Sequence, residues 1–200
     1  TPSGFSAMAV IRISGTKATK IAGKLSNQKA VLKHQKAELR PLYIKKKLID
    51  KVVFTAFLSP RSYTGEDVVE ISCHGNLHIC EAVITEIIRF GARIAEPGEY
   101  TKRAYLNGKL NLLQAESVSL LIKSKSIESV KQQTKNLTGG VTEKIEKIKN
   151  NLMTVLSQLE YELDVSESCF LEKKSINFIK TTLQKCLKQT TSMIETFNKG

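Results

Sequence analysis

The sequence predicts an α+β domain over residues 1–110, with a mixed β-sheet and helices, followed by an all-α domain of long antiparallel helices over residues 111–200. In the first part, short runs rich in Val and Ile alternate with segments whose apolar residues recur at helical spacing. From Asn111 onward only the helical spacing continues. Strands interleaved with helices, followed by helices alone, indicate an α+β domain joined to a helical bundle.

The strand-like runs of the first part are short and are bounded by turn-forming residues. Two of them flank Lys45-Lys46-Lys47 and predict a β-hairpin, with the lysines at a solvated tip. The expected strands lie at residues 7–14, 42–44, 51–58, 68–75 and 92–95.

Three helices are expected among these strands. The first covers residues 16–25, and the third covers residues 99–106, after the turn Pro97-Gly98. Asn76 is placed to cap the second helix, and Gly91 to end it in the left-handed conformation that favours glycine.

The second part contains a helical stripe over residues 112–122 and a longer one over residues 127–163. Gly139-Gly140 interrupts the longer stripe, and two glycines cost about 2 kcal/mol in a helix interior. Leu137 and Val141 nevertheless keep the phase, so we expect one long helix that is bent there.

A polar connection over residues 164–174 leads to a returning helix over residues 176–197. Together with the long helix it predicts an αα-hairpin. Such a hairpin cannot bury both of its stripes, so further helices are missing from the chain or come from another subunit.

The charge of the chain is strongly positive, with 31 Lys and Arg against 19 Asp and Glu and a net charge of +12. This excess favours polyanionic partners, RNA or DNA first and an anionic membrane second. A general lysine bias in composition explains the excess equally well.

The remaining composition points to the cytoplasm. No apolar run approaches the roughly 20 residues needed to span a bilayer, and no signal peptide is recognisable. The four cysteines are irregularly spaced without a CxxC pair, which favours reduced thiols. A chain that begins at Thr1 is expected to have lost its initiator region.

Single charges inside two strand-like runs are the candidate site residues. Arg12 lies between two isoleucines, and Glu70 follows two valines just before a strand-to-helix turn, where ligands often bind. An unpaired buried charge is unfavourable, so each must face water or have a partner. The residues alone leave a ligand site and an ion pair between neighbouring strands open, and favour the ion pair.

We expect no metal site and no catalytic residue. Cys73, His74, His78 and Cys80 fall within eight residues, but their spacing fits no common zinc pattern. Cys73 and His74 are also disfavoured as a nucleophile and base, because neighbours in a strand point to opposite faces.

Four ordered blocks are shared with a known family. They are Thr1-Pro2-Ser3-Gly4 with Arg12-Ile13-Ser14-Gly15; Tyr63-Thr64-Gly65-Glu66-Asp67 with His74-Gly75; Ala95-Glu96-Pro97-Gly98-Glu99-Tyr100-Thr101, continuing to Arg103-Ala104-Tyr105-Leu106-Asn107-Gly108-Lys109-Leu110; and Leu113-Gln114-Ala115-Glu116-Ser117. In this order and spacing the blocks resemble the tRNA modification GTPase family called MnmE or TrmE.

The resemblance implies that residues 1–110 bind 5-formyltetrahydrofolate and hold a homodimer together, and that residues 111–200 are the first part of the family's helical domain. Arg12, Glu70 and Lys109 stand where the family contacts the folate. A carboxylate such as Glu70 can accept both donors of a pterin edge, Arg12 can hold a ligand oxygen, and Lys109 can attract the acidic tail.

The resemblance further implies a parent enzyme that hydrolyses GTP and, with an FAD-containing partner (MnmG), adds a carboxymethylaminomethyl group to carbon 5 of the wobble uridine in certain tRNAs. The chain departs from the family by Phe5-Ser6-Ala7-Met8 after its opening block, by the lack of a GxxxxGK[ST] phosphate loop and by the lack of the C-terminal cysteine motif. GTP, potassium and magnesium are therefore expected only in a GTPase domain that the chain lacks.

Two alternatives remain open. The chain is either a non-catalytic dimerisation and RNA-docking module without a folate site, or an independent folate-dependent one-carbon transferase. The transferase needs a nucleophile or base that the sequence does not display.

Overall fold

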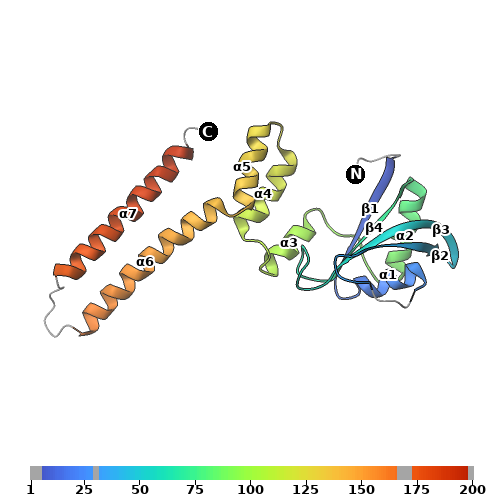
Figure 1. Ribbon diagram of the computed structural model, residues 1–200, viewed down its shortest axis with the longest axis horizontal. Coiled ribbons are helices and arrows are strands. Elements are labelled where there is room, and N and C mark those ends of the chain that lie inside the picture. The colour runs from blue at the N-terminus through green and yellow to red at the C-terminus, as the bar shows by residue number, and fades with distance from the viewer. Residues whose placement is uncertain (1–5, 29–31, 166–172, 198–200) are drawn as a thin grey trace. The chain divides into compact units, whose positions relative to one another are not determined.

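A computed structural model describes residues 6–28, 32–165 and 173–197 of the chain (Figure 1). The block Thr1-Pro2-Ser3-Gly4 and most of the expected connection over residues 164–174 lie outside the described residues. The chain forms two compact units, residues 1–123 and 124–200. Within its described part, no helix is both long and apolar enough to cross a membrane.

The first unit is built on an antiparallel sheet of β1 (Ser6–Ser14), β2 (Ala37–Ile44), β3 (Lys47–Phe57) and β4 (Val68–Gly75). The spatial order is β1-β4-β3-β2, and an isolated parallel bridge joins His34 to Ala56. This sheet, together with the helices that pack on it, confirms the α+β class that the sequence predicts.

The expected hairpin is confirmed, with longer strands than the sequence indicates. β2 and β3 pair up to Ile44 and Lys47, so Lys45 and Lys46 alone form the turn. Both have positive φ angles, 49° and 66°. This is the backbone of a type I′ turn, whose twist matches that of the flanking strands.

Helices α1 (Ala18–Ser26) and α2 (Leu77–Arg89) pack on one face of the sheet. Ile13, Phe54 and Ile71 point into this core because side chains alternate along a strand. The expected cap of α2 is confirmed, since the Asn76 side chain accepts a hydrogen bond from the His78 N–H at 2.9 Å.

The prediction of a strand over residues 92–95 is wrong. This segment links α2 to α3 (Glu99–Leu106) without strand pairing. Gly91 (φ 97°), left-handed as expected, and Gly98 (φ 79°) turn the chain at its two ends. The Arg93 side chain donates to the Glu99 carboxylate, so side-chain bonds hold the segment where we expected a ladder.

The helices after α3 are α4 (Leu112–Lys123) in the first unit and α5 (Ile127–Leu137), α6 (Gly140–Val165) and α7 (Lys173–Phe197) in the second. α6 and α7 form the expected antiparallel pair and bury Val155 and Cys186 (Figure 1). Much of their apolar surface stays exposed, including Leu152, Leu156, Leu183, Leu187 and Ile194.

The prediction of one continuous helix over residues 127–163 is also wrong. Gly139 has a φ of 92°, which a right-handed helix cannot accommodate, so α5 ends before it and α6 begins after it. Glycine is the usual residue at such a helix end. The apolar phase continues across the break, which is why periodicity alone does not detect it.

We predict that Gly139→Ala lowers the free energy of unfolding by about 1 kcal/mol, because a Cβ is unfavourable at positive φ. Chemical denaturation measures the loss, and Thr138→Ala, at a φ of −78°, is the control. A more stable Gly139→Ala protein with a higher helix content would instead support one continuous helix.

Candidate functional site

Arg12 and Glu70 lie side by side on the face of the sheet opposite α1 and α2. They are directly paired in the register of β1 and β4, and Arg12 Nε donates to Glu70 Oε1 at 2.6 Å. The side chains are 60 % and 28 % exposed. The ion pair that the sequence favours is therefore present, in a position that a ligand can reach. An exposed pair contributes little stability, so its groups can be recruited by a ligand at small cost.

The face around this pair is rich in exposed apolar side chains. The strand register places Thr55 beside Glu70, and Val10, Ser72, Val53 and Leu39 in the neighbouring row. Val10 and Leu39 are 36 % and 69 % exposed, and Met8 of the same strand face is 57 % exposed. The Arg12–Glu70 pair thus lies at one side of an apolar sheet surface.

The loop between β3 and β4 is folded by its own polar side chains, as its turn-forming sequence predicts. The Asp67 carboxylate accepts from the Ser59 N–H at 2.9 Å, and the Ser59 hydroxyl donates to the Gly65 carbonyl at 2.9 Å. Ser62 donates to the Glu66 carbonyl. The loop is therefore an ordered platform at the end of the sheet nearest Arg12.

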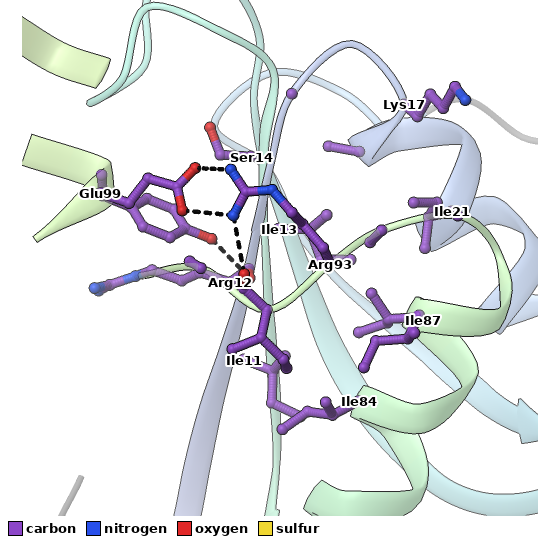
Figure 2. A pocket seen from close by; sticks show the side chains of 18 of the residues that line it. Ile11, Arg12, Ile13, Ser14, Lys17, Ile21, Ile84, Ile87, Arg93 and Glu99 are labelled. Carbon is purple, nitrogen blue, oxygen red and sulfur yellow. Dashed lines mark hydrogen bonds and ion pairs between the residues drawn. The ribbon is translucent and has the colours of Figure 1, made fainter. Parts of the chain in front are cut away.

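A chain of ion pairs joins this loop to α3. Glu66 Oε2 accepts from the Ser14 hydroxyl at 2.9 Å and from Arg103 Nη1 at 2.8 Å. Arg103 also donates to Glu99 Oε1, at 2.6 Å from Nη2. Arg93 binds the same carboxylate through two nitrogens, at 2.6 and 2.8 Å (Figure 2). We call Arg93, Glu99, Arg103 and Glu66 the ion-pair chain.

The ion-pair chain holds the pKa of Glu99 far below its usual range. Hydrogen bonds from Arg93, then from the Glu96 N–H and from Arg103, cause the shift and outweigh burial, which acts in the opposite direction. The shift means that Glu99 stabilises the fold in its charged form.

Other contacts fix α3 against the sheet and the loop. The Tyr100 hydroxyl donates to the Arg12 carbonyl at 2.8 Å, and the Tyr63 and Thr101 hydroxyls lie 3.0 Å apart. Asn107 Nδ2 donates to the Thr64 carbonyl at 2.7 Å. α3 therefore bridges β1 and the loop.

Lys109 follows α3 and lies over the same loop. Its ammonium donates to the Pro60 carbonyl at 3.0 Å, and its side chain lies against Gly65. The structure thus brings Arg12 and Glu70 into contact and places Lys109 on the loop beside them, hydrogen-bonded to main chain. That these three residues bind a folate stays a prediction.

The ion-pair chain was not predicted from the sequence. The spacing of Glu99 and Arg103 within a helix, four residues apart, was an available signal for their pairing. The contacts of Arg93 and Glu66 depend on how the loop and the segment before α3 pack against each other. The apolar periodicity of a segment does not indicate which other segment it contacts.

Cys73, His74, His78 and Cys80, which are close together in the sequence, do not form a ligand-binding cluster in the structure. His74 Nδ1 lies 2.9 Å from Asp50 Oδ1, and the His74 N–H donates to the same carboxylate. The pKa of Cys73 is raised to about 11 by burial and by Cys80. In the described part of the chain, no three His, Cys, Asp or Glu side chains are grouped to hold a metal ion.

Two family models match the chain. "GTP-binding protein TrmE N-terminus" matches residues 1–109 and "MnmE helical domain" matches residues 112–200. Similar curated proteins include the "tRNA modification GTPase MnmE" of Fervidobacterium nodosum, 38 % identical over 94 % of this chain and 42 % of its own length. The protein of the same name from Thermosipho melanesiensis is 40 % identical over 88 % of this chain and 40 % of its own length. The one from Mycoplasma mycoides is 37 % identical over 89 % of this chain and 39 % of its own length. The chain thus spans about two fifths of the length of these relatives.

We predict that Glu99→Gln lowers the melting temperature at pH 7. Because the folded pKa is depressed, the stabilisation is fully present above the unfolded pKa of about 4.3 and is lost as the pH falls toward the folded value. Melting curves should therefore show a difference from the unsubstituted protein that narrows progressively below about pH 4. The control is Glu96→Gln, and a difference that stayed constant from neutral to acid pH would contradict the role of the Glu99 charge.

Proposed function

The chain belongs to the tRNA modification GTPase family called MnmE or TrmE, and from this premise we propose that residues 1–110 bind 5-formyltetrahydrofolate and join two copies of the protein as a dimer. The observation that carries the folate proposal is the partly exposed Glu70 carboxylate beside Arg12 on the sheet face opposite α1 and α2.

The chemistry of a pterin suits this pair. A pterin edge presents an N–H and an amino group side by side, and a carboxylate can accept from both. Glu70 is the acceptor in this arrangement, and Arg12, already bonded to Glu70, offers further donors to a ligand oxygen.

Lys109 is proposed to attract the acidic tail of the folate. Lys109 is exposed, and its ammonium donates to a neutral carbonyl, that of Pro60. Exchange of this neutral acceptor for a carboxylate is favourable, because an ammonium bonds an ionised acceptor more strongly than a neutral one.

The dimer is proposed to cover the apolar sheet face. Exposed apolar patches of this kind commonly mark interaction surfaces, and this one continues from the Arg12–Glu70 pair. A second copy would shield Met8, Val10 and Leu39 from water and enclose the folate next to them.

In the parent protein, this segment is proposed to supply folate binding, dimerisation and partner docking for modification of carbon 5 of the wobble uridine in certain tRNAs. The proposed partners are tRNA, which the net charge of +12 supports, and an FAD-containing protein (MnmG).

The proposed site of action is the cytoplasm. GTP hydrolysis, with its potassium and magnesium, is assigned to no residue here, and the domain boundary is proposed near residue 110.

One observation favours the alternative of a dimerisation and RNA-docking module without folate. Arg12 and Glu70 already satisfy each other at 2.6 Å, so their presence is explained without a ligand. The transferase alternative has less support, because the raised pKa of Cys73 makes its thiol a poor nucleophile.

Calorimetric titration of 5-formyltetrahydrofolate into the 200-residue chain tests the folate proposal. We predict saturable binding that Glu70→Gln weakens by about tenfold or more, because a charged acceptor is replaced by a neutral one. Glu81→Gln, an exposed carboxylate on α2, is the matched control. Absence of binding, or binding that Glu70→Gln leaves unchanged, would refute a folate site at this pair.

Sedimentation analysis tests the dimer. We predict that Leu39→Glu weakens dimerisation by about tenfold or more, because the new carboxylate would be buried without a partner. Leu77→Glu is the control, since Leu77 is an exposed leucine of α2 on the other side of the sheet. If the Leu39→Glu protein dimerises as strongly as the unsubstituted chain, this face is not the interface.

A further inference from the structure

The first unit contains a cavity of about 430 Å³ on the helix side of β1 (Figure 2). It lies between β1, the start of α1, the side of α2, the segment over residues 91–95 and α3. Its floor is made of isoleucines from three elements, Ile11 and Ile13 of β1, Ile21 of α1, and Ile84 and Ile87 of α2. The volume is in the range of sites that bind small molecules.

The mouth of the cavity carries the perturbed groups of the ion-pair chain. Arg93, Glu99, Tyr100 and Arg103 all line it. The pKa of Tyr100 is raised by burial, and the pKa values of both arginines are raised by their bonds to acids. An apolar cavity whose mouth collects groups of this kind is the ordinary form of a binding site.

The charge at the mouth favours an anion. The cationic side chains at the mouth are Lys17, Arg93 and Arg103, against Glu99. Arg12 also lines the cavity, but its side chain points to the opposite face of the sheet and pairs there with Glu70. Glu66, outside the lining, neutralises Arg103, which leaves one positive charge in excess. Arg93 is 64 % exposed and donates to Glu99 and to the Ile94 carbonyl through three bonds. A guanidinium has five N–H donors, so Arg93 retains capacity for a further acceptor.

We propose that this cavity binds a small amphipathic anion, an aliphatic or aromatic body with one carboxylate. The body lies on the isoleucine floor and the carboxylate reaches Arg93 at the mouth. This site is separate from the proposed folate site, because Ile11 and Ile13 point to the helix side of β1 whereas Arg12 points to the opposite face.

Octanoate is the probe for the first experiment, with the isoleucine δ1 methyl groups of the chain labelled with ¹³C for NMR. We expect saturable shifts of the lining methyl groups, Ile11, Ile84 and Ile87 among them. Ile71, buried in the core, reports on the fold, and Ile145, on an apolar surface of the second unit, reports on non-specific association. Absence of shifts, or equal shifts at Ile145, would overturn the proposal.

Substitutions separate the two parts of the site. Ile84→Trp fills the cavity and is expected to abolish the shifts, whereas Ile49→Trp, at an exposed position outside the lining, is expected to preserve them. Octanol lacks the carboxylate and is expected to bind more weakly than octanoate. Arg93→Gln should reduce this preference by about threefold, the scale of an exposed ion pair.

Three further results would overturn the proposal: full binding to the Ile84→Trp protein, equal affinity for octanoate and octanol, or an unchanged preference in the Arg93→Gln protein. Glu70→Gln should leave octanoate binding intact, which keeps this test independent of the folate proposal. The Ile71 methyl signal confirms in each variant that the fold is retained.

Discussion

The position of α3 depends on one carboxylate held between two guanidinium groups. Glu99 accepts from Arg93 before the helix and from Arg103 within it, and Arg103 continues to Glu66 in the loop. This ion-pair chain ties the segment after α2, the helix and the loop into one piece. Lys109 follows α3, so its place over the loop depends on the same bonds.

The sheet separates two chemistries because side chains alternate along each strand. Toward α1 and α2, β1 contributes isoleucines to the core and to the floor of the cavity. Toward the opposite face it contributes Arg12, which meets Glu70 across the strands. A single strand thereby serves the proposed folate site, the proposed dimer surface and the proposed anion cavity, and Arg93, Glu99 and Arg103 of the ion-pair chain line that cavity.

Much of the fold could be predicted from the sequence, because most of its helices and strands carry their own signals of apolar spacing, capping residues and turn residues. Asn76 caps α2 and the lysine turn joins β2 to β3 as expected. The failures involve information that apolar spacing does not contain. Gly139 breaks a stripe whose phase is unaffected, and residues 92–95 are held by the side-chain bonds of Arg93. Arg12 and Glu70 could be singled out as charges in strands, but their direct pairing depends on a register between distant segments.

The most direct test asks whether the position of Lys109 depends on the ion-pair chain. It compares the binding of two ligands to the Arg103→Gln protein: 5-formyltetrahydrofolate, and tetrahydropterin, which has the ring without the acidic tail. We predict that affinity for the folate falls by about fivefold while affinity for the pterin is unchanged, because Lys109 but not Glu70 depends on α3. Arg89→Gln, which removes a different ion pair, is the control. An equal loss for both ligands, or no loss for the folate, would contradict the role of the ion-pair chain in positioning the site.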